Sequence, residues 1–213
     1  MAHLFPIYLD LSGKKCLVIG GGPVAERKVE NLLDYGVNIK LVSPQVEKKI
    51  EQWAEDGIIT WLPREFEETD LKEVFIVFVA TNDGSVNQTA VELCRQKGIL
   101  ANAVDDPPNC DFFIPSIIRR DSLVVAISTE GKSPLFARRL REELEQVITP
   151  EYGEFVTILG EMRIRIKEIV PDIELRKKIF QDLVDSDILI LLKAGEKQKA
   201  RERIEQCMSS WLA

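Results

Sequence analysis

The chain has 213 residues, of which 45% are hydrophobic and 30% charged, and its formal net charge is −7. This composition is typical of a globular protein with a sizeable core, and the acidic balance excludes a general nucleic-acid binder, which needs a basic face. No apolar run approaches the roughly 20 residues of a membrane span, and the N-terminus lacks the basic leader of a secretory signal, so a cytoplasmic protein is expected.

Cysteine and histidine usage narrows the chemistry further. The four cysteines are scattered without a CxxC pair, and the one histidine is His3. This spacing predicts free, buried thiols in a reducing compartment, without disulfides or a zinc site. Because His3 lies in a segment expected to fray, metal sites and catalytic triads that depend on histidine are not expected.

Short apolar runs alternate with amphipathic stretches from residue 15 to residue 104. The apolar runs predict strands at residues 16–20, 37–42, 57–62, 74–81 and 100–104. The amphipathic stretches predict helices at residues 24–36, 46–55 and 85–98, the last capped by Ser85. Strands that alternate with helices predict an α/β fold, a Rossmann-type, doubly wound parallel sheet.

The pattern changes after Pro108. Apolar runs at residues 111–118 and 122–129 have only a short RRD turn between them, so they are predicted to pair antiparallel. A helix is predicted over residues 133–147, with Ser133 as its N-cap and a proline as its first residue.

The last part of the chain shows only helical patterns. They are interrupted at Gly153, Pro171 and the pair 194–195. The predicted division is a nucleotide-binding domain over residues 1–113, a β-rich segment over 114–150 and a small helical domain over 151–213.

A glycine-rich segment, GGGPVA, lies between the first predicted strand and the first predicted helix. It places Gly20, Gly22 and Ala25 in a G-x-G-x-x-A frame. The first glycine allows a tight turn, the second lets the backbone approach a pyrophosphate, and the small third residue lets the helix pack on the strand. The helix N-terminus then offers free N–H groups to the phosphates. In this position the motif predicts a dinucleotide site.

One part of the usual fingerprint is missing. In most such sites an Asp or Glu at the end of the second strand bonds the ribose 2′-hydroxyl. Here the sequence is LVSPQ, and Ser43 occupies the place of the acid. A serine hydroxyl can also bond a ribose, and no arginine stands beside it to receive a 2′-phosphate, although Lys48 and Lys49 are not far. The sequence therefore favours NAD over NADP.

Two carboxylates, Asp105 and Asp106, directly follow the fifth predicted strand. Ligands of such sheets bind outside the carboxyl ends of the strands, where a carboxylate can transfer a proton while a hydride moves to the cofactor. Strand alternation sends the two acids to opposite faces, so only one is expected to point into the cleft, and the pattern does not decide which. A solvated loop is the alternative interpretation.

Five blocks stand out in chain order: CLVIGGGPVAERK, FVATND, NAVD, FFIPSIIRR and STEGKSPLFARRLRE. Together they resemble the precorrin-2 dehydrogenase family, whose module also forms the N-terminal part of siroheme synthase. In some members this module is also a sirohydrochlorin ferrochelatase. The resemblance runs from about Pro6 to Glu145, and the helical end of the chain has no sharp motif.

The resemblance implies NAD-dependent removal of two hydrogens from precorrin-2, which gives sirohydrochlorin on the way to siroheme. It implies a cofactor site that joins the Gly20 turn to Gly22, Pro23, Val24, Ser43, Pro44, Gln45 and Thr81. It places the acid–base aspartate of the family at Asp105 and gives Asp106 no counterpart. It also implies a homodimer joined through residues 112–147. Whether this chain inserts ferrous iron into sirohydrochlorin stays open, and Asp105 would be the first candidate base.

A tetrapyrrole fringed with carboxylates needs cations in its site, and residues 114–141 carry more basic than acidic side chains. The candidate substrate-binding residues in this stretch are Arg119, Arg120, Thr129, Ser133 and Arg138. The alternative is that the arginines of residues 138–141 form the solvated side of an amphipathic helix, and the sequence does not separate the two.

Two other functions remain open. A regulatory module that binds NAD only to bias a partner would explain the glycine loop but would give Asp105 no task. A dehydrogenase for a different small substrate would need a histidine, lysine or tyrosine near the cofactor, and the sole histidine is misplaced. Adding precorrin-2 and NAD to the protein separates all three.

Overall fold

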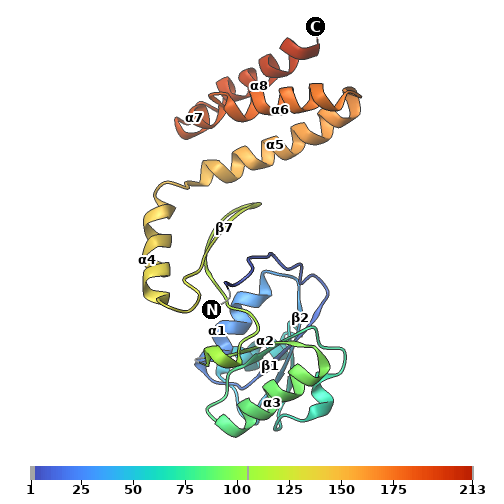
Figure 1. The fold of residues 1–213 in the computed structure, drawn as a ribbon, viewed down its shortest axis with the longest axis vertical. Coiled ribbons are helices and arrows are strands. Elements are labelled where there is room, and N and C mark those ends of the chain that lie inside the picture. The colour runs from blue at the N-terminus through green and yellow to red at the C-terminus, as the bar shows by residue number, and fades with distance from the viewer. Residues whose placement is uncertain (1–2, 105, 213) are drawn as a thin grey trace. The chain divides into compact units, whose positions relative to one another are not determined.

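Contacts between residues divide the chain into two units, Met1–Ile114 and Pro115–Ala213, which are described separately (Figure 1). The computed structural model describes residues 3–104 and 106–212. Unit 1 corresponds closely to the predicted nucleotide-binding domain. Unit 2 contains both the β-rich segment and the helical region that the sequence suggested as separate domains.

Unit 1 is built on a five-stranded sheet in the order β3-β2-β1-β4-β5, and all four neighbouring pairs are parallel. The strands are β1 (Lys15–Ile19), β2 (Asn38–Val42), β3 (Thr60–Leu62), β4 (Ile76–Val79) and β5 (Leu100–Ala103). This topology, with a helix between successive strands along most of the chain, confirms the predicted α/β, Rossmann-type fold.

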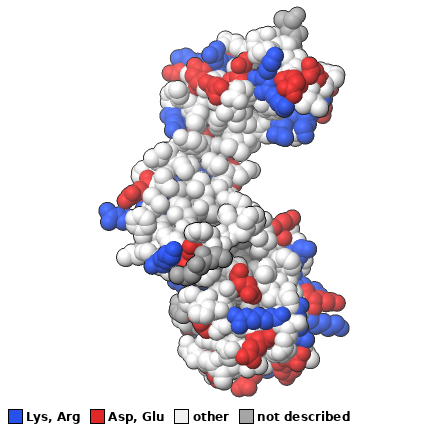
Figure 2. Space-filling view, in the orientation of Figure 1, with Lys and Arg blue, Asp and Glu red and all other residues white. Residues whose placement is uncertain are grey.

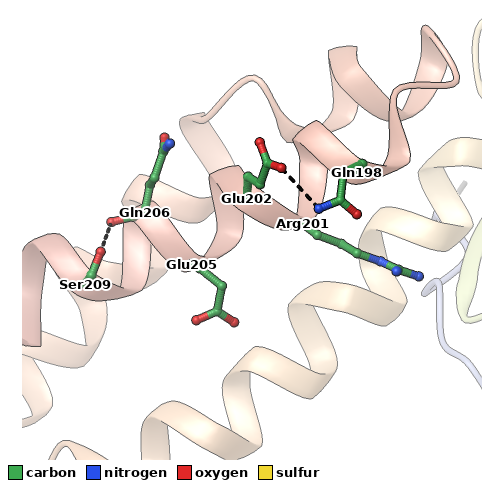
Figure 3. A pocket seen from close by; sticks show the side chains of 6 residues that line it. All are labelled: Gln198, Arg201, Glu202, Glu205, Gln206 and Ser209. Atoms are coloured by element: carbon green, nitrogen blue, oxygen red, sulfur yellow. Dashed lines mark hydrogen bonds between the residues drawn. The ribbon is translucent and has the colours of Figure 1, made fainter.

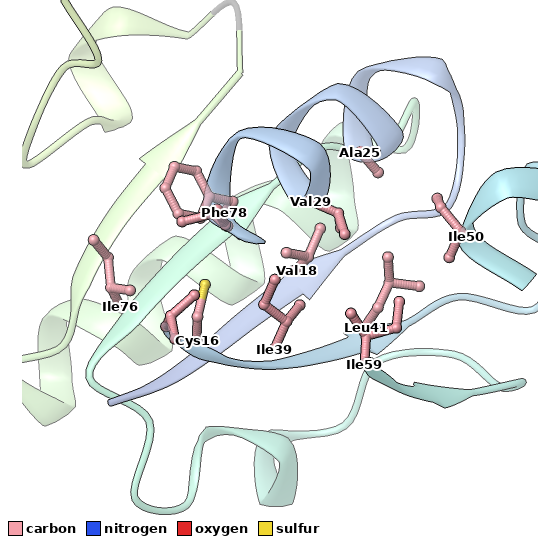
Figure 4. Close-up of a cluster of buried hydrophobic side chains, with 12 residues drawn as sticks. Cys16, Val18, Ala25, Val29, Ile39, Leu41, Ile50, Ile59, Ile76 and Phe78 are labelled. Atoms are coloured by element: carbon pink, nitrogen blue, oxygen red, sulfur yellow. The ribbon is translucent and has the colours of Figure 1, made fainter. Parts of the chain in front are cut away.

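Helices cover both faces of this sheet. They are α1 (Pro23–Leu33) and α2 (Lys48–Glu55) on one face and α3 (Gly84–Lys97) on the other, with short 3₁₀ turns η1 (Glu68–Leu71) and η2 (Pro107–Asn109). Alternate residues of β1 point to the two faces of the sheet. Cys16 and Val18 pack towards α1 (Figure 4). Leu17 and Ile19 pack towards α3. Burial on both faces explains why the strands read as nearly continuous apolar runs.

The start of α3 differs from the prediction. Asp83, not Ser85, caps this helix, because its carboxylate accepts hydrogen bonds from the backbone N–H groups of Ser85 and Val86. The Ser85 hydroxyl also donates to Asp83, at 2.6 Å. These bonds, the one from the Ser85 side chain first, lower the pKa of the Asp83 carboxyl. Ser85, the residue predicted as N-cap, therefore donates hydrogen bonds to Asp83, which is the N-cap residue in the structure.

Unit 2 begins with a β-hairpin. Strands β6 (Ser116–Arg120) and β7 (Leu123–Ile127) pair antiparallel as predicted, across a tight turn in which Asp121 has a φ of 50°. The next helix, α4 (Pro134–Glu145), is capped as predicted, since the Ser133 hydroxyl oxygen accepts a bond from the Phe136 N–H at 3.3 Å. Ile118 is 1% exposed between the hairpin and the helices that pack on it, α4 and α5 (Pro150–Ile169).

Four helices complete unit 2: α5 (Pro150–Ile169), α6 (Ile173–Asp185), α7 (Ile188–Lys193) and α8 (Lys197–Leu212). They share one apolar core, in which Ile166, Ile179 and Ile188 are fully buried. The predicted breaks at Pro171 and Gly195 are confirmed, but the predicted break at Gly153 is wrong.

Gly153 lies inside α5, where the helix crosses the hairpin turn. A Cβ at this position would stand 2.7 Å from the Arg120 carbonyl oxygen and 2.8 Å from a carboxylate oxygen of Asp121. The glycine is therefore needed for a close tertiary contact and does not interrupt the helix.

The four cysteines are free thiols. Cys16 and Cys94 are buried, and burial raises the pKa of Cys16 to about 12 and that of Cys94 to about 11, so both are unreactive at neutral pH. Cys110 and Cys207 are only half-buried. No helix within residues 3–104 and 106–212 has the length and apolarity that crossing a membrane would need.

Candidate cofactor and active site

The carboxyl ends of the strands lie side by side at one edge of the sheet. Backbone bonds join the segments that leave them: the Gly20 N–H donates to Val42 at 3.0 Å, and the Ala80 N–H donates to Ile19 at 2.8 Å. Further along the same edge, the Val104 N–H donates to Val79 at 2.9 Å. The loops after β1, β2, β4 and β5 therefore share one edge, which is where ligands bind in parallel sheets.

Gly20 makes the turn out of β1 possible for two reasons. Its φ is 114°, a backbone conformation that residues with a side chain rarely adopt. A Cβ at this position would also stand 2.4 Å from the Ala80 carbonyl oxygen. The tight turn predicted from the first glycine of the motif is present, and it brings the loop directly against the end of β4.

Gly22 leaves the N-terminus of α1 open. It is the N-cap residue in extended conformation, no side chain caps the helix, and a Cβ at Gly22 would meet no atom within 4 Å. Pro23 occupies the first turn, and the first intrahelical bond runs from the Glu26 N–H to the Gly22 carbonyl. Free N–H groups and the positive end of the helix dipole thus face an uncrowded space, which fits a pyrophosphate.

The segment after β2 carries three residues of the predicted cofactor site, of which Ser43 is the one expected to bond a ribose. Ser43 is half-buried, and Pro44 and Gln45 are exposed. The Ser43 hydroxyl donates to the Gln45 carbonyl at 2.7 Å, so its proton is used inside the loop and its oxygen remains an acceptor. The Ser43 hydroxyl can therefore accept a hydrogen bond from a ribose hydroxyl but has no proton left to donate to it.

Gly21, between the two glycines of the motif, was missed by the sequence reasoning. Its carbonyl accepts a bond from the Glu47 N–H at 2.9 Å, and a Cβ at Gly21 would stand 2.1 Å from the Gln45 carbonyl oxygen. The G-x-G-x-x-A frame treats this position as free. The run of three glycines was the signal that could have found it.

Thr81, at the end of β4, has its side chain committed to the start of α3. Its hydroxyl lies 2.6 Å from the Asn87 amide oxygen and accepts from the Asp83 N–H at 3.1 Å. The Asn87 amide in turn donates to the Thr81 carbonyl at 3.0 Å. Because the Thr81 hydroxyl is already hydrogen-bonded, Thr81 would contribute to cofactor binding mainly through its backbone, which lies beside Gly20.

The segment after β5 folds back along the edge of that strand. The buried Asn102 side chain donates to the Phe112 carbonyl at 2.8 Å, and the Asp111 N–H donates to Ala101 at 2.8 Å. Asp105 lies outside the described residues. Asp106 is half-buried, and its carboxylate accepts from the Asn109 amide at 2.7 Å, so it belongs to the turn as expected.

The candidate substrate residues of unit 2 have structural partners of their own. The Arg120 guanidinium donates to the Ile148 carbonyl at 2.9 Å and so fixes the connection between α4 and α5. The Thr129 hydroxyl oxygen accepts from the Ser133 N–H at 3.0 Å. Arg119 is exposed on β6. These contacts account for Arg120, Thr129 and Ser133 without a ligand, and a substrate role for them stays a prediction.

The basic stretch of α4 is balanced by acids that follow it. Each of its three arginines pairs with a glutamate four residues later, at 2.9, 3.2 and 2.7 Å; the pairs are Arg138–Glu142, Arg139–Glu143 and Arg141–Glu145. The apparent excess of positive charge came from a window that ended at residue 141. These contacts favour the alternative of a solvated, amphipathic helix face.

Two surface hollows lie elsewhere on unit 2. The larger, about 510 Å³, is lined by Gln198, Arg201, Glu202, Glu205, Gln206 and Ser209, all from α8 (Figure 3). The other, about 430 Å³, lies between α6 and α8. Neither includes a predicted site residue, and a groove along one helix does not enclose a ligand. Among the described side chains, no three His, Cys, Asp or Glu residues are grouped to hold a metal ion.

Three family models match the chain in order. Residues 7–116 match the family described as "Putative NAD(P)-binding", residues 120–146 match "Sirohaem biosynthesis protein central", and residues 151–208 match "Sirohaem synthase dimerisation region". A nicotinamide cofactor is thus supported for unit 1, without a choice between NAD and NADP. The dimerisation model lies C-terminal to the segment that the resemblance had suggested for dimer contacts.

Curated relatives and a solved structure resemble most of the chain. A siroheme synthase of Nitrosococcus oceani is 36% identical over 203 residues, which is 95% of this chain and 43% of the relative. Siroheme synthase 1 of Serratia proteamaculans is 37% identical over 94% of this chain and 42% of the relative. The chain therefore spans less than half the length of these relatives. The structure of "SirC, precorrin-2 dehydrogenase" matches 95% of this chain and all of its own, with a TM-score of 0.80 and 28% identity.

Proposed function

The chain belongs to the family that joins precorrin-2 dehydrogenases with the N-terminal module of siroheme synthases, and from that premise we propose that it uses NAD to dehydrogenate precorrin-2 to sirohydrochlorin. The observation that carries the proposal is the full-length match to a precorrin-2 dehydrogenase, which includes both units of this chain. The open glycine loop of unit 1 supports the cofactor part of the proposal.

The reaction removes a hydride and a proton from the substrate. When bound, NAD accepts the hydride. The chain itself has to hold the cofactor at the glycine loop and to accept the proton, and we assign the proton to the Asp105 carboxylate. Val104, the residue before it, is bonded to the end of β4, on the edge that also carries Gly20 and Ser43. In parallel sheets of this kind the proton acceptor of a dehydrogenase is expected beside the bound cofactor, at the carboxyl ends of the strands.

NAD is proposed over NADP because no arginine stands beside Ser43 in the sequence and because Lys49, one of the two nearby lysines, already has an acidic partner. Lys49 bonds Glu30 at 2.6 Å and lies over the Trp53 ring, so its charge is already paired. We expect NAD to bind at least about tenfold more tightly than NADP. Isothermal titration of both nucleotides measures this ratio, and equal affinities would contradict the assignment.

We also propose a homodimer formed by unit 2. The hairpin forms its own two-stranded sheet, and such strands have edges open to further pairing. On α4, Leu135 is 78% and Phe136 57% exposed. Figure 2 shows mainly uncharged side chains over the hairpin on the face in view, with charged side chains along the outer edge of α4. An apolar surface of this kind is typical of subunit contacts.

Replacing Leu135 with glutamate is expected to shift the protein from dimer to monomer, because it buries a charge in the proposed contact. Ile190→Glu adds the same charge at a 68% exposed position of α7, inside the region matched by the dimerisation model, and so tests that region as the alternative contact. Light scattering after size exclusion measures the mass against the 24.2 kDa chain. If only Ile190→Glu dissociates the dimer, the interface lies on the C-terminal helices and not on α4.

The assay that tests the function combines purified protein, precorrin-2 and NAD, and follows NADH formation and the absorbance of the product. Turnover distinguishes the proposed enzyme from a module that binds NAD only to regulate a partner. Ferrous iron and sirohydrochlorin, added in a second assay, test metal insertion separately. We further propose a cytoplasmic location, in keeping with the four free thiols.

A further inference from the structure

Gly21 is buried between the turn out of β1 and the segment after β2. A Cβ at this position would lie 2.1 Å from the Gln45 carbonyl oxygen and 2.8 Å from both the Ser43 hydroxyl oxygen and a methyl group of Val46. The φ angle of Gly21 is not positive, so its backbone conformation does not itself require a glycine. The glycine is therefore required by the approach of another segment and not by its own backbone conformation.

The ribose loop, Ser43–Val46, is the segment that approaches Gly21. Hydrogen bonds hold it at both ends. The Trp61 indole N–H donates to the Ser43 carbonyl at 2.9 Å, and the N–H of Glu47, directly after the loop, donates to Gly21 at 2.9 Å. The Ser43 hydroxyl closes the loop on itself through Gln45. The glycine loop and the ribose loop are thus packed as one piece.

We propose that Gly21 is a positioning residue: because it has no side chain, the ribose loop can pack against it in the position where that loop contacts the adenosine end of the cofactor. This inference rests on the proposed function, because it assumes a nicotinamide dinucleotide on the glycine loop. A methyl group at Gly21 has to displace the ribose loop, since the atom it meets first is backbone. The pyrophosphate site at Gly22 and α1 keeps its own geometry, so binding weakens while the chemical step persists.

The test compares Gly21→Ala with Gly22→Ala. The second variant adds the same methyl group where no protein atom lies within 4 Å, so it intrudes on the bound phosphates but not on the ribose loop. For Gly21→Ala we expect the NAD dissociation constant, measured by isothermal titration, to rise at least about tenfold. The turnover number with precorrin-2 at saturating NAD should change by less than about threefold.

A spectroscopic readout reports the loop without cofactor. The indole N–H of Trp61 bonds the first residue of the ribose loop, so its ¹H–¹⁵N resonance follows the position of that loop. The protein has three tryptophans, and Trp61→Phe assigns the peak. In the absence of NAD, Gly21→Ala should move the Trp61 resonance and Gly22→Ala should leave it in place.

A second pair of variants keeps the inference testable if Gly21→Ala does not fold. Glu47 has a φ of −64°, which proline also adopts, so Glu47→Pro fits the local φ. It removes the N–H that donates to Gly21 and sets a ring carbon against the Gly21 carbonyl, which pushes the end of the ribose loop away from Gly21. Glu47→Ala loses the same carboxylate but keeps the N–H. We expect NAD to bind at least about fivefold more weakly to Glu47→Pro than to Glu47→Ala.

The outcomes separate the inference from the function on which it rests. Wild-type protein that binds NAD and turns over, together with wild-type affinity and an unmoved Trp61 resonance in Gly21→Ala, would overturn the positioning role alone. Equal affinities of the two Glu47 variants would also overturn it. Wild-type protein that does not bind NAD would overturn the proposed function itself.

Discussion

Replacing Asp105 with asparagine is expected to reduce the turnover number for precorrin-2 by about 10²–10⁴-fold, the range that general acid–base groups contribute. The amide keeps the size of the side chain but cannot accept the proton that leaves the substrate with the hydride. The NAD dissociation constant should stay within about twofold of wild type, because the residues assigned to the cofactor belong to the loops after β1, β2 and β4. Stopped-flow detection of NADH measures the first quantity, and isothermal titration measures the second.

The neighbouring acid supplies the matched control. The Asp106 carboxylate accepts a bond from the Asn109 amide, and an asparagine at the same position retains an oxygen that can accept it. Asp106→Asn should therefore keep turnover within about threefold of wild type. Full activity in Asp105→Asn, or a large loss confined to Asp106→Asn, would refute the assignment of the base. Running both variants in the iron-insertion assay shows whether any chelatase activity depends on the same carboxylate.

Local rules were sufficient for the elements whose signals are local. The Ser133 cap of α4 and the Gly20 turn were predicted because a cap and a positive φ depend on a few neighbouring residues. The parallel sheet was predicted because short apolar runs alternate with amphipathic stretches from residue 15 to residue 104. The edge of the sheet that carries the candidate site followed from that topology.

Features set by residues outside the motif or the sequence window could not be predicted in this way. Gly153 resembles a helix breaker in sequence, but its role is contact with the hairpin turn. Gly21 resembles a variable position, but the Gln45 carbonyl fills the space beside it. The arginines of α4 suggested an anion site until their glutamate partners, which follow directly, were included. In each case the deciding neighbour lay outside the motif or the window.

Asp70, in the 3₁₀ turn η1, is a buried carboxylate that is only 1% exposed. Its carboxylate accepts two bonds from the Arg64 guanidinium, at 2.8 and 2.7 Å, and one from the Glu67 N–H at 3.0 Å. Lys40 on β2 lies 3.2 Å away. Burial alone would raise the pKa of Asp70, but the bonds from Arg64, the Glu67 N–H and Lys40 outweigh it and lower the pKa to about 2. This cluster joins η1 to β2.

Because the folded pKa of Asp70 lies below its unfolded value, the carboxylate stabilises the fold above about pH 4. The contribution is lost as the pH falls from about 4 towards 2, where the folded state also takes up the proton. A shift of this size corresponds to about 2 kcal/mol of unfolding free energy. Urea unfolding followed by tryptophan fluorescence should show this loss over that pH range.

Asp70→Asn is expected to lower the unfolding free energy at pH 7 by about 2–4 kcal/mol, because the amide leaves Arg64 and Lys40 without their shared counter-charge. The cost should be below the value for fully buried ions, since both cations are about one-third exposed and can turn towards water. Glu68→Gln is the control, because Glu68 lies in the same 3₁₀ turn but pairs with Lys97 at the surface, which predicts a loss below about 1 kcal/mol. The difference between wild type and Asp70→Asn should shrink as the pH falls from about 4 towards 2. Equal losses in the two variants, or a difference that does not depend on pH, would mean that Asp70 does not stabilise the fold through its charge.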